Sequence, residues 1–118
     1  MIVSYRVAKA LVTMNTVAGA LDFGENDKPI ISVGLAGLSG RAVKRIRLGQ
    51  VFQCHQILQD QLPIIAVGGI DSGLDIHKSE LAGAVAFQMT TAVIGGNRIN
   101  PNVFSRVIDE YINLESSR

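Results

Sequence analysis

The chain has 118 residues, which is enough for one modest domain. Apolar residues make up 47% and charged residues 18%, so the composition excludes a disordered chain. A net charge of +1 and 5% aromatic residues without Trp argue against a nucleic-acid-binding surface.

Cysteine content and the N-terminal segment bear on the cellular compartment. A single cysteine, Cys54, excludes an internal disulfide framework and is typical of a reducing compartment. No apolar run approaches the roughly 20 residues that a membrane span needs. The first residues carry Arg6 and Lys9 where a secretory leader would need an uninterrupted apolar core. We therefore expect a cytoplasmic protein that contacts neither membrane nor nucleic acid.

The first third of the chain predicts short strands around a long loop. Residues 2–10 are compatible with a short helix or a frayed lead-in. Residues 11–14 (LVTM) are short, apolar and partly β-branched, which is typical of a buried strand. Residues 22–29 are rich in turn formers and predict a surface excursion. Residues 30–33 (IISV) form a second strand candidate, or only the return arm of that excursion.

Three helices are predicted in the remainder, over residues 41–58, about 72–81, and from Pro101 onward. The first carries side chains at i, i+3, i+4 and i+7 on one face: Leu48, Val51, Phe52 and His55. The second can be capped by Ser72 and ended by Gly83. The third has a wide apolar stripe: Val103, Phe104, Val107, Ile108, Tyr111 and Ile112.

Apolar strands at residues 64–67 and 84–89 alternate with these helices. Alternation of this kind predicts parallel strands joined by helical crossovers. Three main parallel strands leave two open edges, whereas a closed β/α barrel takes eight strands and about 250 residues. We therefore expect residues 1–118 to form a single partial-barrel domain that associates with itself or with a partner chain, or that is a fragment.

Two glycine-rich turns precede predicted helices, GLAGLSG at residues 34–40 and GGIDSG at residues 68–73. Glycine lacks a Cβ, so the backbone can approach a ligand closely and present bare N–H groups to an anion. A helix N-terminus also favours negative charge. Together the turns predict a phosphate-bearing ligand. The alternatives are tight turns without a ligand, and a Rossmann site, for which the G-x-G-x-x-G spacing is missing.

Charged residues near these turns have simpler interpretations. A basic group early in the first helix is interpreted as a solvated face, or as cations offset by a bound anion: Arg41, Lys44, Arg45 and Arg47. Asp71 and Asp75 flank a helix start, where capping explains them better than catalysis.

The remaining reactive side chains predict no metal centre. His55 and His77 have no second ligand at metal-binding spacing and are interpreted as surface or interface residues. Cys54 lies mid-helix and is expected to be a small packing residue.

Four groups of residues stand out by their order and spacing: NTVAG at 15–19, AGLSG at 36–40 with Lys44, PIIAVGGI at 63–70, and AGA at 82–84 with Gln88, Thr91 and Ala92. Together they resemble the C-terminal part of dihydroorotate dehydrogenases. The sequence PNVFSRVI at 101–108 is similar to the last helix of the soluble members. The resemblance covers nearly the whole chain and implies an α/β fold, about the last three β/α units of a TIM barrel that binds FMN at the C-terminal ends of its strands.

The resemblance also implies an activity and a set of roles. The activity is the FMN-dependent oxidation of dihydroorotate to orotate in pyrimidine biosynthesis. Asn15 and Thr16 would hold the pyrimidine substrate, and the backbone of Met14 would touch the flavin. The phosphate of FMN would be cradled by five residues: Gly40, Gly68, Gly69, Thr90 and Thr91.

The chain departs from the family pattern in several places. The family usually has Gly where this chain has Ala36 and Thr90, and many members have Pro or a small residue at Arg41 and Arg45. The family's catalytic base and flavin-contacting lysine lie upstream of this stretch, and Cys54 is not the base cysteine of soluble members. No catalytic residue is therefore assigned. The alternative function is a non-catalytic remnant, or a subunit that binds a phosphate-bearing ligand or completes a barrel with another chain.

Overall fold

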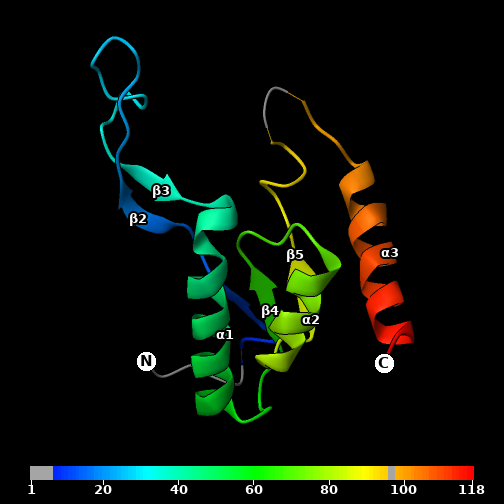
Figure 1. Ribbon diagram of the computed structural model, residues 1–118. Helices are drawn as coiled ribbons and strands as arrows, with labels where there is room; N and C mark the ends of the chain where they lie inside the picture. Colours follow the sequence, from blue (N-terminus) through cyan, green and yellow to red (C-terminus); the bar gives the residue numbers. More distant parts are fainter. Residues whose placement is uncertain (1–6, 96–97) are drawn as a thin grey trace.

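The computed structural model describes residues 7–95 and 98–118 (Figure 1). The elements in chain order are β1 (Leu11–Thr13), β2 (Val17–Ala20), β3 (Ala36–Leu38), a 3₁₀ turn η1 (Gly40–Val43), α1 (Lys44–Leu58), β4 (Ile64–Val67), α2 (Gly73–Leu81), β5 (Ala86–Gln88) and α3 (Asn102–Ser116). The helix considered over residues 2–10 falls mostly outside the described residues, and residues 7–10 are not helical.

A parallel sheet with the strand order β1-β4-β5 lies at the centre of the fold. Leu11 pairs with Ile64, and Ile65 pairs with Ala86, so β4 is the middle strand. The predicted parallel arrangement is confirmed. The third strand is shorter than predicted, because the N–H of Ala84 donates to the carbonyl of Ser79 at the end of α2 before pairing begins.

A separate antiparallel pair, β2 and β3, was not predicted from the sequence. Figure 1 shows this hairpin and its loop projecting from the rest of the fold. The strand considered for residues 30–33 does not form, and the N–H of Gly34 donates to the carbonyl of Ile31 in a turn there. The pairing partner of β2 lies farther along, at Ala36–Leu38, so residues 30–33 are the return arm of the excursion and their apolar side chains are exposed.

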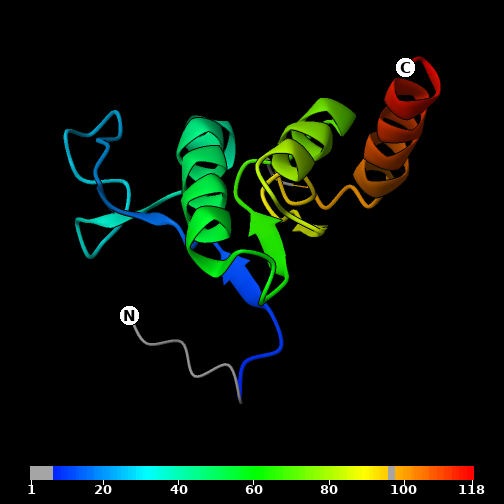
Figure 2. The same ribbon diagram turned by 90° about the horizontal axis from the view of Figure 1, so that it is seen from below.

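The helices α1, α2 and α3 lie in a row beside the sheet (Figure 2). The core between helices and strands is built from small and branched apolar side chains, among them Val51, Ile64, Ala66, Ile70, Ile76 and Val107. Cys54 packs against this core, as expected. Within the described residues, no helix is both long and apolar enough to cross a bilayer.

The ends of α2 follow local sequence signals. The hydroxyl of Ser72 accepts from the N–H of Asp75, which confirms the predicted N-cap. Gly83 follows the C-cap with a φ of 109°, a left-handed conformation in which glycine is favoured. A side chain there would also collide with the His55 ring.

On two helices, only part of the predicted apolar face is buried. In α1, Val51 is fully buried but Phe52 is 52% exposed. In α3, Val107 is fully buried, whereas Ile108 and Ile112 are 50% and 53% exposed. The stripes are wider than the surface that the described residues can cover.

Candidate functional site

A cavity of about 780 Å³ opens at the C-terminal ends of β1, β4 and β5. Parallel strands end on the same side of a sheet, so the segments that follow them meet there. All eight residues that the sequence predicts for substrate and cofactor line this cavity: Met14, Asn15, Thr16, Gly40, Gly68, Gly69, Thr90 and Thr91. A cavity of this size is typical of sites for small organic ligands.

The two glycine-rich turns are in backbone contact with each other. Gly69 has a φ of 70°, and a Cβ built on it would collide with the carbonyl of Gly40. Gly40, with a φ of 73°, in turn lies against Thr91, whose Cγ2 would be 3.2 Å from an added Cβ. The loops after β3, β4 and β5 therefore converge at this end of the cavity, and only glycine allows them to be so close.

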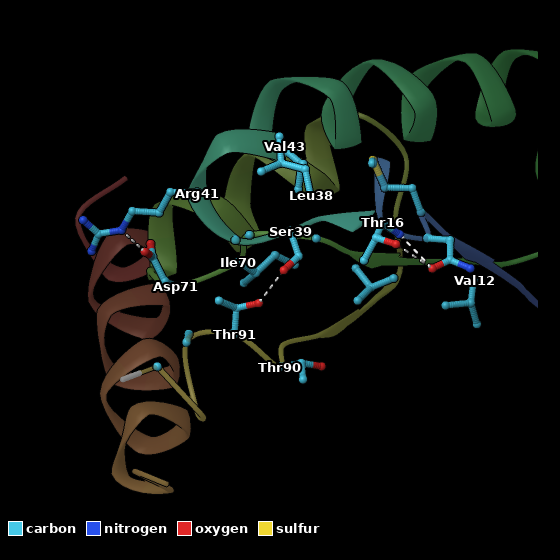
Figure 3. A pocket seen from close by; sticks show the side chains of 18 of the residues that line it. Val12, Thr16, Leu38, Ser39, Arg41, Val43, Ile70, Asp71, Thr90 and Thr91 are labelled. Atoms are coloured by element: carbon cyan, nitrogen blue, oxygen red, sulfur yellow. Dashed lines mark hydrogen bonds and ion pairs between the residues drawn. The ribbon is translucent and has the colours of Figure 1, made fainter. Parts of the chain in front are cut away.

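The two adjacent threonines differ in their surroundings. The hydroxyl of Thr91 lies 3.3 Å from the hydroxyl of Ser39, across the cavity end (Figure 3). The carbonyl of Thr90 accepts from the N–H groups of Val93 and Ile94, which fixes the turn after β5. Thr91 is thus the threonine that joins two of the converging loops through its side chain.

Asn15 and Thr16 occupy the other end of the cavity and are exposed. The carboxamide oxygen of Asn15 accepts from the N–H of Thr16 at 2.7 Å, which holds that side chain close to its own backbone. Thr16 also packs against Gly37, where an added Cβ would collide with its hydroxyl. The carboxamide NH₂ of Asn15 has no hydrogen-bond partner among the described residues.

Asp71 does more than flank a helix start. Its carboxylate accepts from Lys44 Nζ at 2.6 Å and from the guanidinium of Arg41. Burial alone would raise the pKa of Asp71, but the hydrogen bonds from Lys44 and Arg41 outweigh it and lower that pKa to about 2. Lys44 Nζ also lies 2.7 Å from Asp75, so Lys44 belongs to an ion-pair cluster rather than to a solvated basic face.

Arg106 is a cavity residue that the sequence interpretation did not single out. Its Nη2 donates to the carbonyl of Asp71 at 2.9 Å, from the first turns of α3. Its position depends on how α3 returns across the sheet, and no local pattern carries that information. With Arg41, it places two guanidinium groups at the cavity end where the glycine loops meet.

Arg47 contradicts the interpretation of a solvated basic face, because it is fully buried. Its Nη1 donates to the carbonyl of Gly68 at 2.6 Å, while its Nε and Nη2 have no hydrogen-bond partner within the part of the chain that is described. Burial lowers the pKa of Arg47. The burial has a sequence signal: Arg47 lies midway between the buried Val43 and Val51, at i+4 spacing on one helix face.

Comparison with known proteins gives the family. The family model described as "Dihydroorotate dehydrogenase" matches residues 2–114. The chain belongs to the dihydroorotate dehydrogenase family. It is 36% identical over 103 residues to the catalytic subunit of dihydroorotate dehydrogenase B (NAD(+)) of Staphylococcus carnosus, and 38% identical over 104 residues to that of Geobacter sulfurreducens. Each match covers 87% of this chain and 32% of the relative.

Solved structures of the same family share the fold. A dihydroorotate dehydrogenase from Eimeria tenella in complex with ferulenol superposes with a TM-score of 0.73 and 32% identity, covering 92% of this chain and 27% of that one. The ligand-free form of that enzyme gives a TM-score of 0.72 and covers 29% of the solved chain. The expected fold class, an α/β part of a TIM barrel, is confirmed. The chain spans about a third of the length of the relatives it matches.

Proposed function

We propose that this chain forms the phosphate-binding end of an FMN site in a dihydroorotate dehydrogenase-type barrel. The observation that carries the proposal is the convergence of Gly40, Gly69 and Thr91 from three separate loops on one cavity. The N–H of Gly69 has no acceptor among the described residues, and a backbone cradle of this kind suits a phosphate. The residues present therefore fit the group.

Charge at the same end supports an anionic ligand. Arg41 and Arg106 line the cavity there, each also paired with a carboxylate, of Asp71 and Glu110 respectively. The buried guanidinium of Arg47 lies beneath Gly68 with no carboxylate within 4.0 Å among the described residues, and the charges of Asp75 and Asp71 act on it from farther away. A buried cation without an adjacent carboxylate is costly, and a nearby phosphate would offset part of that cost. Gly68 and Thr90 complete the proposed cradle at the edges of the two loops.

The opposite end of the cavity is proposed to receive a small pyrimidine. Asn15 offers its free carboxamide NH₂ and Thr16 its hydroxyl, both of which can bond to the oxygens of dihydroorotate or orotate. Met14, 8% exposed, lies between this end and the glycine loops, where its backbone would touch the flavin ring. FMN, when bound, supplies the hydride acceptor for the oxidation of dihydroorotate in pyrimidine biosynthesis.

The chemistry also needs a base near the substrate carbon. Among the residues that the structure describes, those lining the cavity include no His, Cys or Lys, and Asp71 is held ionised by Arg41 and Lys44 at the far end. We therefore propose that the catalytic base belongs to a part of the barrel beyond these elements. The cytoplasmic location stays a prediction.

A second candidate is a non-catalytic subunit that completes a barrel with another chain or with its own copies. Two features favour it: β1 and β5 are the outer strands of the described sheet, and α3 exposes Phe104, Ile108 and Ile112 along one side. Unpaired strand edges next to apolar surface are sites of association. Both candidates use the same phosphate cradle, so they differ in catalysis rather than in ligand class.

Titration of the purified chain with FMN and with riboflavin, followed by flavin fluorescence, tests the proposal. FMN is expected to bind and riboflavin, which lacks the phosphate, to bind at least roughly tenfold more weakly, because charge-assisted bonds to the phosphate are lost. Equal affinities, or no binding of either, would refute the phosphate site. Dihydroorotate with FMN is expected to give no turnover above an FMN-only control, and turnover by the chain alone would contradict the assignment of the base elsewhere.

A further inference from the structure

A cluster of metal-ligating side chains lies between α2 and α3, outside the cavity. His77 and Glu80 stand at i and i+3 on α2, and Glu115 stands near the end of α3. One ligand atom of each residue lies within 4.8 Å of the other two. The sequence alone did not suggest this group, because Glu115 is far from the other two along the chain.

His77 is the unusual member of the cluster. It was interpreted as a surface or interface residue, but it is only 6% exposed. Neither imidazole nitrogen has a hydrogen-bond partner among the described residues, although a buried ring normally has one. Its Nδ1 faces Glu115 Oε1 at 3.2 Å without the alignment of a hydrogen bond.

That separation suits two ligands of one ion. Zn²⁺ takes His nitrogen and carboxylate oxygen at about 2.0–2.2 Å with tetrahedral angles, which places neighbouring ligand atoms roughly 3.3 Å apart. Glu80 and Glu115 are exposed, so small rotations of their side chains can close the remaining gap. One imidazole and two carboxylates form a donor set that first-row divalent cations favour.

A neighbouring hydroxyl orients one of the carboxylates. Tyr111, one turn before Glu115 on α3, donates its O–H to Glu80 at 2.8 Å. Within the described part of the chain, no Lys or Arg lies within 4.0 Å of Glu80 or Glu115, so no basic side chain competes with a metal ion for these carboxylates. Hydrogen bonds that hold a ligating carboxylate in this way are typical of metal sites.

We propose that His77, Glu80 and Glu115 bind a divalent transition-metal ion, with Zn²⁺ the preferred class, and that the ion ties the end of α3 to α2. The bound ion satisfies the buried imidazole and neutralises the two carboxylates. The role is structural, because these residues do not line the cavity.

Thermal unfolding of the full chain with Zn²⁺, Mg²⁺ or EDTA tests the site, and Co²⁺ absorbance in the visible range reports the ligand geometry. Zn²⁺ is expected to raise the melting temperature and Mg²⁺ to have no effect. E115Q and E80Q should weaken Zn²⁺ binding roughly tenfold or more. The matched control is D109N, an exposed acid on α3 that removes the same charge.

The remaining outcomes overturn the proposal. Cys54 and His55 are the other soft donors, so C54S is measured in parallel. Zn²⁺ binding that is lost in C54S but kept in E115Q places the ion elsewhere. If Zn²⁺ has no effect on the wild-type chain, or if E115Q, E80Q and D109N bind it equally, His77 and Glu115 form an ion pair without a metal.

Discussion

The two sides of α3 contrast sharply although both are apolar in sequence. Val103 and Val107 face α2 and the core and are 8% and 0% exposed. Ile108 and Ile112 lie on the adjoining side and are 50% and 53% exposed. The same contrast holds on α1 between Val51 and Phe52. The apolar pattern therefore specifies more contacts than the described residues make among themselves.

The exposed apolar side chains agree with the finding that this chain matches only about a third of each relative's length. One side of these helices folds the chain, and we propose that the other side is the place where further barrel elements, or another copy, pack. Sequence periodicity cannot separate the two sides, because both consist of the same residue types at helical spacing.

The largest expected effect comes from placing a charge on each side of α3 in turn and comparing the losses in stability. V107D places an unpaired charge in the core and should lower the free energy of unfolding by more than about 3 kcal/mol. I108D, the neighbouring control, places the same charge at a half-exposed position and should cost less than about 1 kcal/mol in the isolated chain. Urea unfolding followed by circular dichroism measures both. Equal losses would show that the two sides are not distinct.

Association sharpens the same comparison. We expect the purified chain to sediment with a mass above 12.6 kDa at high micromolar concentration, because apolar flanks and strand edges are exposed. The double variant I108E/I112E should shift the population toward the monomer without loss of helicity. A stable 12.6 kDa monomer of the unmodified chain would count against association through the exposed side of α3.

The same comparison of a crowded and an uncrowded position can be made with two glycines, one at the cavity and one on α1. G69A should weaken FMN binding roughly tenfold or more, because the new methyl group would collide with the carbonyl of Gly40 and force the two loops apart. The control is G49A in α1, where an added Cβ meets nothing within 4 Å. G49A should keep FMN affinity and stabilise the helix by up to about 1 kcal/mol. Unchanged affinity in G69A, with the fold intact, would contradict the cradle.

The smallest expected effect is a pH dependence from Asp71. Its pKa in the folded chain is about 2, below its ordinary value of 3.8, so the ionised form favours folding. That contribution is fully present above about pH 4 and is lost as the pH falls toward 2. D71N should remove this part of the acid sensitivity, whereas D109N, at an exposed position outside the ion-pair cluster, should not. Acid unfolding curves of the two variants, followed by far-UV circular dichroism, decide the point.

Local signals predicted part of this structure well. The strand around residues 64–67 and the cap at Ser72 depend on their own neighbours in sequence, and both form where expected. The hairpin of β2 and β3 depends on pairing across a long loop with an irregular register near Gly19, which no local pattern records. Burial of His77 depends on how α2 packs against α3, whereas the i+4 spacing of Arg47 from the buried Val43 and Val51 is a local signal of its burial.

The candidate site was likewise predicted in part, and the rest depends on how distant segments pack. The family resemblance selected eight residues, and the structure gathers them around one cavity. It could not supply the ionic partners Arg41 and Asp71 or the position of Arg106, since these result from how the loops and α3 meet in space. Their roles in binding remain predictions.

The buried hydrogen bond between Arg47 and Gly68 also fixes the orientation of the peptide group between Gly68 and Gly69. A trans peptide is planar, and its carbonyl and N–H point to opposite sides. Arg47 holds the Gly68 carbonyl toward α1, so the N–H of Gly69 in the same peptide must point away from that helix. Gly69 itself lines the cavity. The donor is thus oriented before any ligand arrives, and an incoming anion needs no rearrangement of this loop to find it.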